Sequence, residues 1–267
     1  MLFRSDALLD AGVQVTQAHI ARDGTARSLP TGHRRGEQPP STYTDLSAPA
    51  LLDAPPESLE QLLAHVAASA PTTIVLPALH GPGDEDGSVV AVASASGLNF
   101  VGDTPTAAAL GMQKPLAKAT ARACGIPTLP EFVVDAVAWG SDRHAVLQRL
   151  AAFAEVHAPT GALIGKPIAH GSSIGMRIAR TAGEWPAAVD EALRYGEGAM
   201  LEPYLERARE LEVAVLERRD GSVQSFGPGE VFPGREFYDY DAKYAPGVSR
   251  TATDSDLPAS KIGRAHV

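Results

Sequence analysis

The sequence predicts an α/β amino-terminal domain followed by α+β domains. In the amino-terminal part, apolar β-rich runs alternate with helical segments, as at 72–79 and 88–95, which is typical of a parallel sheet. In the second half, strands outnumber helices, and the Asp-Gly pair at 220–221 marks a hairpin turn between two of them. Strands joined by such short turns form an antiparallel sheet. The chain has 267 residues, 44% of them apolar, which is enough to bury real cores in one large domain or in several small ones.

The composition restricts the classes of partner. The net charge of -9 argues against a general nucleic-acid or membrane-surface binder, because both of those partners are anionic. A single cysteine, Cys124, cannot form an internal disulfide or a CxxC metal site, which is typical of a reducing compartment. No apolar run has the length of a membrane span, and no signal-peptide pattern opens the chain. We therefore expect a cytoplasmic protein that binds neither nucleic acid nor membrane.

The first domain is expected at residues 1–105. Hydrophobic spacing and turn residues predict, in order, a helix at 6–11, a strand at 13–20, a helix at 56–68, a strand at 72–79, a helix at 88–95 and a strand at 99–101. Residues 21–55 are rich in Gly, Pro, Ser, Thr and Arg and have no period, so we interpret them as a long excursion rather than a core element. His80 follows the strand at 72–79, at the sheet edge where parallel sheets bind ligands.

Two further domains are expected at 106–198 and 199–260. The pattern predicts, in order, a helix at 114–124, a strand at 131–134, a helix at 142–156, strands at 162–164 and 176–179, a helix at 184–195, and strands at 199–205 and 210–217. Residues 234–258 show little periodicity but contain many Tyr, Asp, Lys and Gly residues. A stretch of that length and composition is typical of a functional lid.

The segment 165–175 has the composition of a phosphate-binding hairpin. Lys166 ends one apolar run, and Gly171 and Gly175 bracket the pair Ser172 and Ser173 before the next run begins. Backbone N–H groups and two hydroxyls can converge there on one anion, with a lysine beside them. The order differs from that of a P-loop, in which the lysine follows the glycines and begins a helix. Taken alone, the segment also fits a flexible hairpin with an exposed lysine.

Three features together indicate nucleotide chemistry. The lysine-glycine-serine hairpin can hold phosphates, an acidic stretch with Glu202 and Glu210 can hold a nucleoside, and the tyrosine-rich and lysine-containing segment 236–244 can close over both. With these motifs in order along residues 5–258, the chain resembles the D-alanine–D-alanine ligases of the ATP-grasp superfamily. The resemblance rests on 79–81 with 85–87, on 166–167 with 171–175, on 209–216, and on 237–240 with 243–244. It implies ATP-grasp domains at 106–198 and 199–260.

The resemblance also implies an activity. In this family, ATP phosphorylates the carboxylate of one D-alanine, and the amine of a second D-alanine attacks the resulting D-alanyl phosphate, which supplies a peptidoglycan precursor for the cell wall and cell shape. The implied cofactors are ATP and Mg²⁺, and the implied assembly is a homodimer. The charge of the acyl phosphate must be neutralised and water must be excluded from the site.

The resemblance assigns roles residue by residue. The ATP-binding residues are Lys114, Lys166, Ser172, Ser173, Glu202, Leu205, Glu210 and Lys243; the catalytic residues are Ser172, Lys243 and Tyr244; and the D-alanine-binding residues are His80 and Tyr244. Lys114 and Lys166 are implied phosphate ligands, Glu202 and Leu205 adenine contacts, and Glu210 a ribose contact. Each has a plainer alternative, which is surface charge for the lysines and glutamates, turn residues for the serines and a structural role for His80.

Both ends of the chain are interpreted as non-native. Residues 1–5 and 261–267 match translations of one sequencing adapter in its two orientations, so 261–267 is expected to be a non-native tail. The family's first strand with its glycine-rich loop, and its magnesium ligands, are then expected to lie outside this chain. We therefore expect the chain itself to be inactive, although its parent is a ligase. The alternatives are another ATP-grasp ligase for an amino acid or hydroxy acid, or a non-catalytic nucleotide-binding module.

Overall fold

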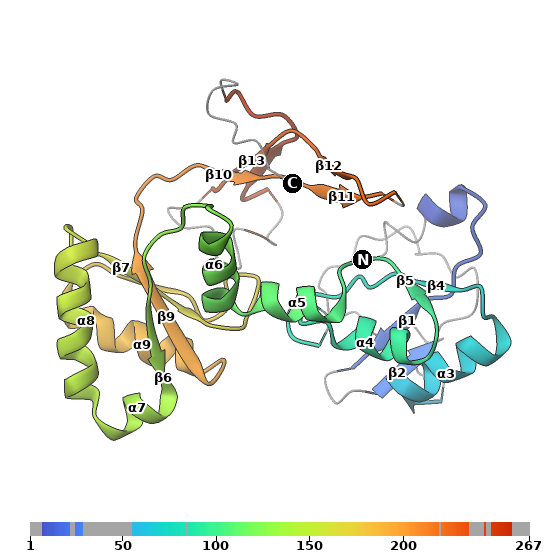
Figure 1. The fold of residues 1–267 in the computed structure, drawn as a ribbon, viewed down its shortest axis with the longest axis horizontal. Coiled ribbons are helices and arrows are strands. Elements are labelled where there is room, and N and C mark those ends of the chain that lie inside the picture. The colour runs from blue at the N-terminus through green and yellow to red at the C-terminus, as the bar shows by residue number, and fades with distance from the viewer. Residues whose placement is uncertain are drawn as a thin grey trace. The chain divides into compact units, whose positions relative to one another are not determined.

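The computed structural model describes residues 7–21, 25–28, 55–83, 85–218, 220–234, 243 and 247–257. The chain forms two compact units, Met1–Met112 and Gln113–Val267, which are described separately below. Figure 1 shows the elements of both units. The three-domain division at 105 and 198 remains a prediction. No helix in the described ranges is long and apolar enough to cross a lipid bilayer.

The first unit begins with a small antiparallel sheet. Residues 7–10 are helical, and the strands β1 (Ala18–Ile20), β2 (Thr25–Ser28) and β3 (Glu57–Ser58) follow. β2 pairs with both neighbours, and its Ala26 is fully buried. The interpretation of 21–55 as an excursion without core elements is therefore wrong at 25–28. The four residues of β2 offer one apolar side chain, so its backbone pairing left no hydrophobic pattern in the sequence.

The rest of the first unit follows the predicted alternation of helix and strand. α3 (Leu59–Ser69), β4 (Ile74–Val75), α4 (Ser88–Ala95), β5 (Asn99–Phe100) and α5 (Pro105–Met112) come in order. β4 and β5 pair in parallel, as predicted. Ser58 and Gln61 form a capping box that begins α3, which satisfies backbone N–H groups at the first turn. A small core around Leu63, Ala93 and Leu98 holds α3 and α4 together.

The second unit is built around a four-stranded antiparallel sheet of order β6-β9-β7-β8. Its strands are β6 (Phe132–Asp135), β7 (Leu163–Pro167), β8 (Arg177–Ala179) and β9 (Gly198–Pro203). Its helices are α6 (Lys114–Ala123), α7 (Ala136–Ser141), α8 (Arg143–His157) and α9 (Trp185–Leu193), with a 3-10 turn η1 (Ala182–Glu184) before α9. The sequence did not predict α7, a short helix that Asp135 caps with its carboxylate.

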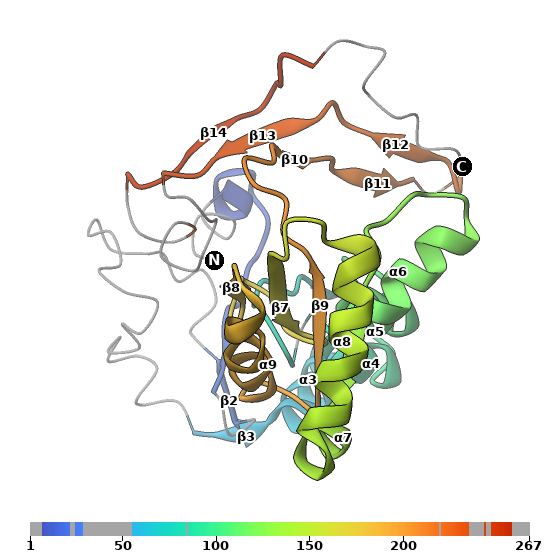
Figure 2. The same cartoon turned by 90° about the vertical axis from the view of Figure 1, so that its left-hand side faces the viewer.

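The two faces of this sheet have different chemistry. Figure 2 shows α8 and α9 side by side over the same face of β7 and β9. Leu150 of α8 and Val189 of α9 share a fully buried core with Leu163 and Leu201 of the strands. Side chains alternate between the two faces along a strand. Lys166 therefore lies on the face of β7 opposite to Leu163, and Glu202 lies on the face of β9 opposite to Leu201. The apolar face packs against α8 and α9 and holds the sheet in place, and the opposite face carries the charged side chains.

The remaining strands form two smaller sheets. β10 (Glu210–Glu212), β13 (Gly229–Phe232) and β14 (Arg250–Ala252) form one antiparallel sheet, and β11 (Val215–Glu217) pairs with β12 (Val223–Ser225) in a hairpin. The single strand predicted at 210–217 is thus two strands in different sheets. The expectation of little regular structure at 234–258 is wrong at β14, where three residues pair with β13; residues 235–242 and 244–246 lie outside the described part.

Arg209, the residue before β10, forms ion pairs with Glu230 of β13 and with Asp256, which follows β14. Its Nε lies 2.7 Å from Oε1 of Glu230, and its Nη2 lies 2.6 Å from Oδ1 of Asp256. Arg209 holds the pKa of Glu230 below its usual value, although burial opposes this. The buried Glu230 carboxylate on β13 is therefore paired rather than left without a countercharge.

We predict that Gly165→Ala destabilises the second unit. An added Cβ would lie 2.8 Å from the carbonyl oxygen of Ala188, because β7 packs closely against α9. Overpacking of this kind costs about 1–3 kcal/mol of unfolding free energy. Gly140→Ala in α7 is the control, because nothing lies within 4 Å of its added Cβ, and it should leave stability equal or raise it. Urea titrations of both variants measure the difference; equal midpoints for Gly165→Ala and wild type would contradict the prediction.

Candidate functional site

The hairpin predicted around the glycine-serine segment is present. β7 and β8 pair antiparallel, and the chain between them turns at 172–175. Ser172 and Ser173 both have φ 55°, a left-handed conformation that is uncommon for residues other than glycine. The Ile174 N–H donates to the carbonyl oxygen of Gly171 at 3.2 Å, which closes the turn. Two successive left-handed serines show that this loop has a defined shape rather than that of an extended connection.

The loop is attached to the end of α9 through Tyr195. An added Cβ on Gly175, which has φ 68°, would lie 2.5 Å from Cδ2 of Tyr195 and 2.8 Å from Cγ of Pro167. The ring of His170 meets the ring of Tyr195 edge-on, with 5.9 Å between the centroids. Glycine at 175 is thus required both by its backbone conformation and by the close approach of the aromatic ring.

Lys166 and Glu202 form an ion pair across neighbouring strands. In the β7–β9 register, Ile164 is opposite Glu202 and Lys166 is opposite Met200, so Lys166 and Glu202 are diagonal neighbours on one face. The Lys166 Nζ donates to Oε2 of Glu202, whose side chain is only 7% exposed. The structure therefore brings together two of the residues that the sequence assigned to ATP binding.

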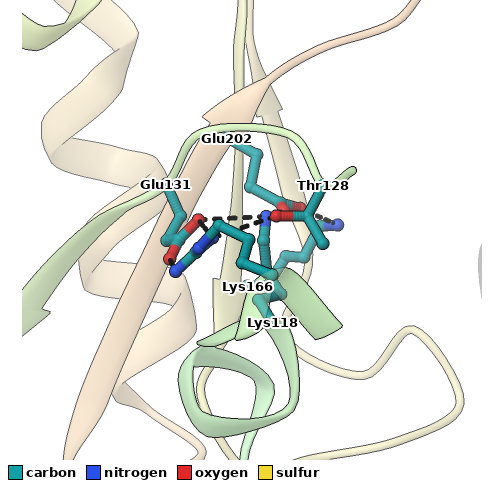
Figure 3. Close-up of polar contacts among 6 residues, drawn as sticks. Lys118, Thr128, Glu131, Lys166 and Glu202 are labelled. Atoms are coloured by element: carbon teal, nitrogen blue, oxygen red, sulfur yellow. Dashed lines mark hydrogen bonds and ion pairs between the residues drawn. The ribbon is translucent and has the colours of Figure 1, made fainter. Parts of the chain in front are cut away.

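A second lysine, Lys118 of α6, contacts the same carboxylate. Its Nζ donates to Oε1 of Glu202 and lies 3.4 Å from Oε2 of Glu131, the residue that precedes β6. Figure 3 shows Lys118 and Lys166 on either side of Glu202. Beyond Glu131, Arg122 donates to both carboxylate oxygens, at 2.8 and 2.6 Å. The site is thus a connected series of five charged side chains.

Lys118 and Arg122 are not among the site residues predicted from the sequence. Lys114, Lys118 and Arg122 follow one another at intervals of four residues, so they lie along one face of α6. Like charges at that spacing repel, and a helix that carries them on one face needs anionic or carbonyl partners for them. The first finds its partner at the loop, because the Lys114 Nζ donates to the carbonyl oxygen of His170. The repeated spacing was the signal that could have identified the other two.

α6 also meets the hairpin through its backbone. The Lys114 N–H donates to the carbonyl oxygen of Ile168 at 2.9 Å. Two contacts from one residue therefore join the first turn of α6 to the beginning of the glycine-serine loop. Lys114 contacts this loop from α6, and Lys166 lies on β7, the strand that precedes the loop.

The carboxylates of the site are held in their ionised form. Burial raises the pKa of Glu202, but the charges and hydrogen bonds of Lys166 and Lys118 outweigh burial and bring it below its ordinary value. The hydrogen bonds of Arg122 lower the pKa of Glu131, with a further contribution from Lys118 and opposition from burial. Both glutamates are therefore negative at neutral pH, and their cations are engaged as ion pairs.

Among the residues that the structure describes, the others predicted to bind the nucleotide are not shown to contact Lys166 or Glu202. Leu205 and Glu210 are exposed, the first after β9 and the second at the start of β10. Within the described part of the chain, the hydrogen bonds and ion pairs that join Lys166 to Glu202 do not extend to either of them. Lys243 is partly buried, and Tyr244 lies outside the described residues. The assignment of these residues remains a prediction.

His80 belongs to the first unit, in the turn that follows β4. The Gly81 N–H donates to Oε2 of Glu85 at 2.7 Å, while the His80 Nδ1 lies 3.9 Å from the other oxygen of this carboxylate. Both side chains are about half exposed, so this is a weak contact. Burial raises the pKa of Asp86, but hydrogen bonds from Gly83 and Ser88 bring it below its ordinary value. The turn is therefore ordered by its own carboxylates.

The connected side chains at this site carry more positive than negative charge. The three cations lie on α6 and β7, and the two carboxylates are Glu202 of β9 and Glu131, which precedes β6. In the described ranges, no group of three or more His, Cys, Asp or Glu side chains is arranged to hold a metal ion.

The fold is that of ATP-grasp ligases. D-alanyl-alanine synthetase A from Vibrio cholerae has a similar structure, with a TM-score of 0.68 and 23% sequence identity over 97% of this chain and 69% of that chain. The family model described as D-ala D-ala ligase C-terminus matches residues 121–265. The fold class predicted from the alternating and antiparallel elements is thus confirmed at the level of this class.

Curated relatives agree with the family model. The D-alanine–D-alanine ligase of Heliobacterium modesticaldum is 33% identical over 234 residues, which are 86% of this chain and 59% of that relative. D-alanine–D-alanine ligase A of Mesorhizobium japonicum is 32% identical over 259 residues, which are 94% of this chain and 68% of that relative. The chain belongs to the D-alanine–D-alanine ligase family, as the sequence motifs predict, and it spans 59% to 68% of the length of these two relatives.

We predict that Glu202→Gln destabilises the second unit at neutral pH and has less effect in acid. Removing the carboxylate leaves Lys118 and Lys166 without their shared countercharge, at a cost of about 3 kcal/mol, the low end for breaking a buried ion pair. The pKa of Glu202 in the folded state lies below its ordinary value of 4.5, so its contribution is complete above that pH and is lost as the pH falls through the folded pKa.

Urea unfolding at pH 7 and pH 3.5 measures this difference. The gap in unfolding free energy between wild type and Glu202→Gln should narrow at the lower pH. Glu155→Gln, at an exposed position of α8, is the control and should track wild type at both values. A gap that stays constant with pH would contradict the ionised pairing.

Proposed function

We propose that this chain carries the ATP-phosphate-binding part of a D-alanine–D-alanine ligase, which joins two D-alanines and supplies a precursor of peptidoglycan. The observation that carries the proposal is that one lysine contacts the glycine-serine loop and a second lies on the strand that leads into it. The Lys114 Nζ donates to the carbonyl oxygen of His170, and Lys166, near the end of β7, donates to Glu202. Membership of the ligase family supports the reaction class, and a cytoplasmic location and a homodimer belong to the same proposal.

The charge of the site fits a polyphosphate. The five connected side chains carry three positive and two negative charges, in a protein whose net charge is -9. A local positive excess on an acidic protein favours a specific anionic ligand over general attraction of anions. The loop adds backbone N–H groups and the hydroxyls of Ser172 and Ser173, which suit phosphate oxygens. Glu202, Leu205 and Glu210 are proposed to hold the nucleoside.

The proposed reaction has two steps. A carboxylate oxygen of the first D-alanine attacks the terminal phosphorus of ATP, so that a D-alanyl phosphate forms and ADP leaves. The amine of the second D-alanine then attacks the acyl carbon, phosphate leaves, and the new amide bond joins the two residues. Lys114 and Lys166 neutralise charge on the transferred phosphoryl group. Lys243 and Tyr244 are proposed to cover the site and exclude water, and His80 to contact the first D-alanine.

Two other functions remain to be distinguished by experiment. A ligase for another amino acid or for a hydroxy acid would use the same phosphate site with a different acceptor. A non-catalytic module would bind ATP without transferring its phosphoryl group. Phosphate release from the 267-residue chain is measured with ATP and Mg²⁺, first with D-alanine alone and then with D-alanine and D-lactate together. Release that depends on D-alanine supports the dipeptide ligase and contradicts the expected inactivity of this chain, and release that needs D-lactate as well supports a hydroxy-acid ligase. ATP binding without release fits the expected inactive part of a ligase as well as the module, and the same assay on the longer parent protein distinguishes these two.

We predict that Lys166→Met weakens ATP binding by about tenfold or more, because it removes the cation beside the loop. Isothermal titration calorimetry with ATP measures the dissociation constant of the variant and of wild type. Arg149→Met is the control, because Arg149 is an exposed cation of α8 stacked on Phe132 and should leave ATP binding unchanged. Equal affinities for Lys166→Met and wild type would refute the proposed phosphate site.

A further inference from the structure

Five charged side chains form what we term the charge series. In order of contact, they are Arg122, Glu131, Lys118, Glu202 and Lys166, and each is paired with the next. The signs alternate, with a cation at each end, so the series has a net charge of +1. It connects α6 and the edge of β6 to the middle of the sheet at β9 and to the end of β7.

Lys118 occupies the middle of this series. The β6–β9 register pairs Phe132 with Leu201, so Glu131 and Glu202 lie at neighbouring positions of adjacent strands. Two carboxylates so placed repel each other unless a cation lies between them. The Lys118 ammonium lies within 4.0 Å of both, and its side chain is only 14% exposed. It therefore compensates both carboxylates in a place where water screens little.

The two ends of the series are not equivalent. Arg122 is held by both oxygens of Glu131 and also donates to Oγ1 of Thr128 at 2.9 Å. Lys166 contacts one oxygen of Glu202, while Lys118 takes the other. The negative charge of Glu202 is thus divided between two lysines, and the uncompensated positive charge lies on the Lys118–Lys166 side. Lys166 is the next-to-last residue of β7, the strand that leads into the glycine-serine loop.

Removing the charge of Lys118 would change this balance. The series would separate into two neutral pairs, Arg122 with Glu131 and Glu202 with Lys166. The carboxylate of Glu202 would then compensate Lys166 alone. A phosphate group would have to compete with a complete ion pair for this lysine, instead of meeting a net positive charge.

We propose that Lys118 is a positioning residue for nucleotide polyphosphate: by sharing the carboxylate of Glu202, it maintains the positive charge with which Lys166 binds phosphate. The inference rests on the proposed function, because it takes Lys166 to be a phosphate ligand. The resemblance gives roles to Lys114 and Lys166 but none to Lys118, so this role is additional to those that the resemblance implies. The recognised chemistry is the charge of the polyphosphate, not the nucleoside.

The test compares Lys118→Met with Lys118→Arg and wild type in the full 267-residue chain. Isothermal titration calorimetry with inorganic triphosphate measures binding through the phosphate charge alone. The same measurement with adenosine measures binding at the nucleoside site. Lys118→Met should bind triphosphate about tenfold more weakly, which corresponds to the loss of one charge-assisted contact, and should bind adenosine as wild type does. Lys118→Arg should restore triphosphate binding, since it restores the positive charge.

A double variant separates charge from structural damage. Lys118→Met with Glu202→Gln removes one cation and one carboxylate together, so the series returns to a net charge of +1. Triphosphate binding should then recover toward the wild-type value, whereas a merely structural role of Lys118 predicts a further loss. Circular dichroism and melting temperature confirm that each variant is folded, and only folded variants are compared.

The outcomes for the two proposals differ. If wild type fails to bind ATP and triphosphate, the proposed function fails. If wild type and Arg149→Met bind while Lys118→Met binds triphosphate as tightly as they do, the proposed function stands and the role of Lys118 is refuted. Equal weakening of triphosphate and adenosine binding in Lys118→Met would also refute it.

Discussion

The buried carboxylate of Glu202 is the constraint on which the second unit depends. A carboxylate in the central strand of a sheet must be paired, because burying an uncompensated charge costs more than most folds can offset. Its two oxygens need cations from two directions. One comes from β7, which requires the observed strand register, and the other comes from α6, which requires the helix to lie against this face. The position of the glycine-serine loop follows, because β7 leads directly into it.

The two faces of the same sheet have different roles, since one packs in the core and the other carries the ion pairs. Its apolar face packs against α8 and α9, and close approach at Gly165 leaves no room for a side chain between β7 and α9. Its charged face meets α6 and the loop. Because side chains alternate along β7 and β9, each strand serves both purposes at once. Apart from Gly175, which lies against Tyr195 and Pro167, changes to the loop therefore need not disturb the core, provided that the strands keep their register.

The parts of the fold with strong local signals were predictable from sequence. The hairpin at 163–179, the amphipathic helix α8 and the parallel pairing of β4 and β5 all follow from hydrophobic pattern and turn residues. β2 was missed because its strand rests on backbone pairing, and the strand at 210–217 was not divided because its apolar pattern continues past the break at 213–214. A hydrophobic pattern indicates which side chains are buried, whereas these two features are defined by the strands with which each segment pairs.

The candidate site was predictable in part. The resemblance supplied Lys166 and Glu202, and the structure shows that they form an ion pair. Their pairing could not be derived from sequence, because it depends on the register between strands 36 residues apart. Lys118 lies outside the motifs, and only its spacing of four residues from Lys114 marks it in the sequence. The roles in ATP and D-alanine binding that the resemblance assigns all remain predictions, since the described contacts do not test them.

The attachment of α6 has a consequence for the conditions under which the protein is studied. None of its ten residues is buried, and its described contacts to the sheet and the loop are made by charged side chains and one backbone hydrogen bond. A charge pair that reaches water, such as that of Arg122, whose side chain is 44% exposed, is screened by dissolved ions, whereas apolar packing contains no charge to be screened. Ionic strength should therefore act on α6 before it acts on α8 or α9. Dilute and concentrated salt would then differ in how firmly the loop's cations are held.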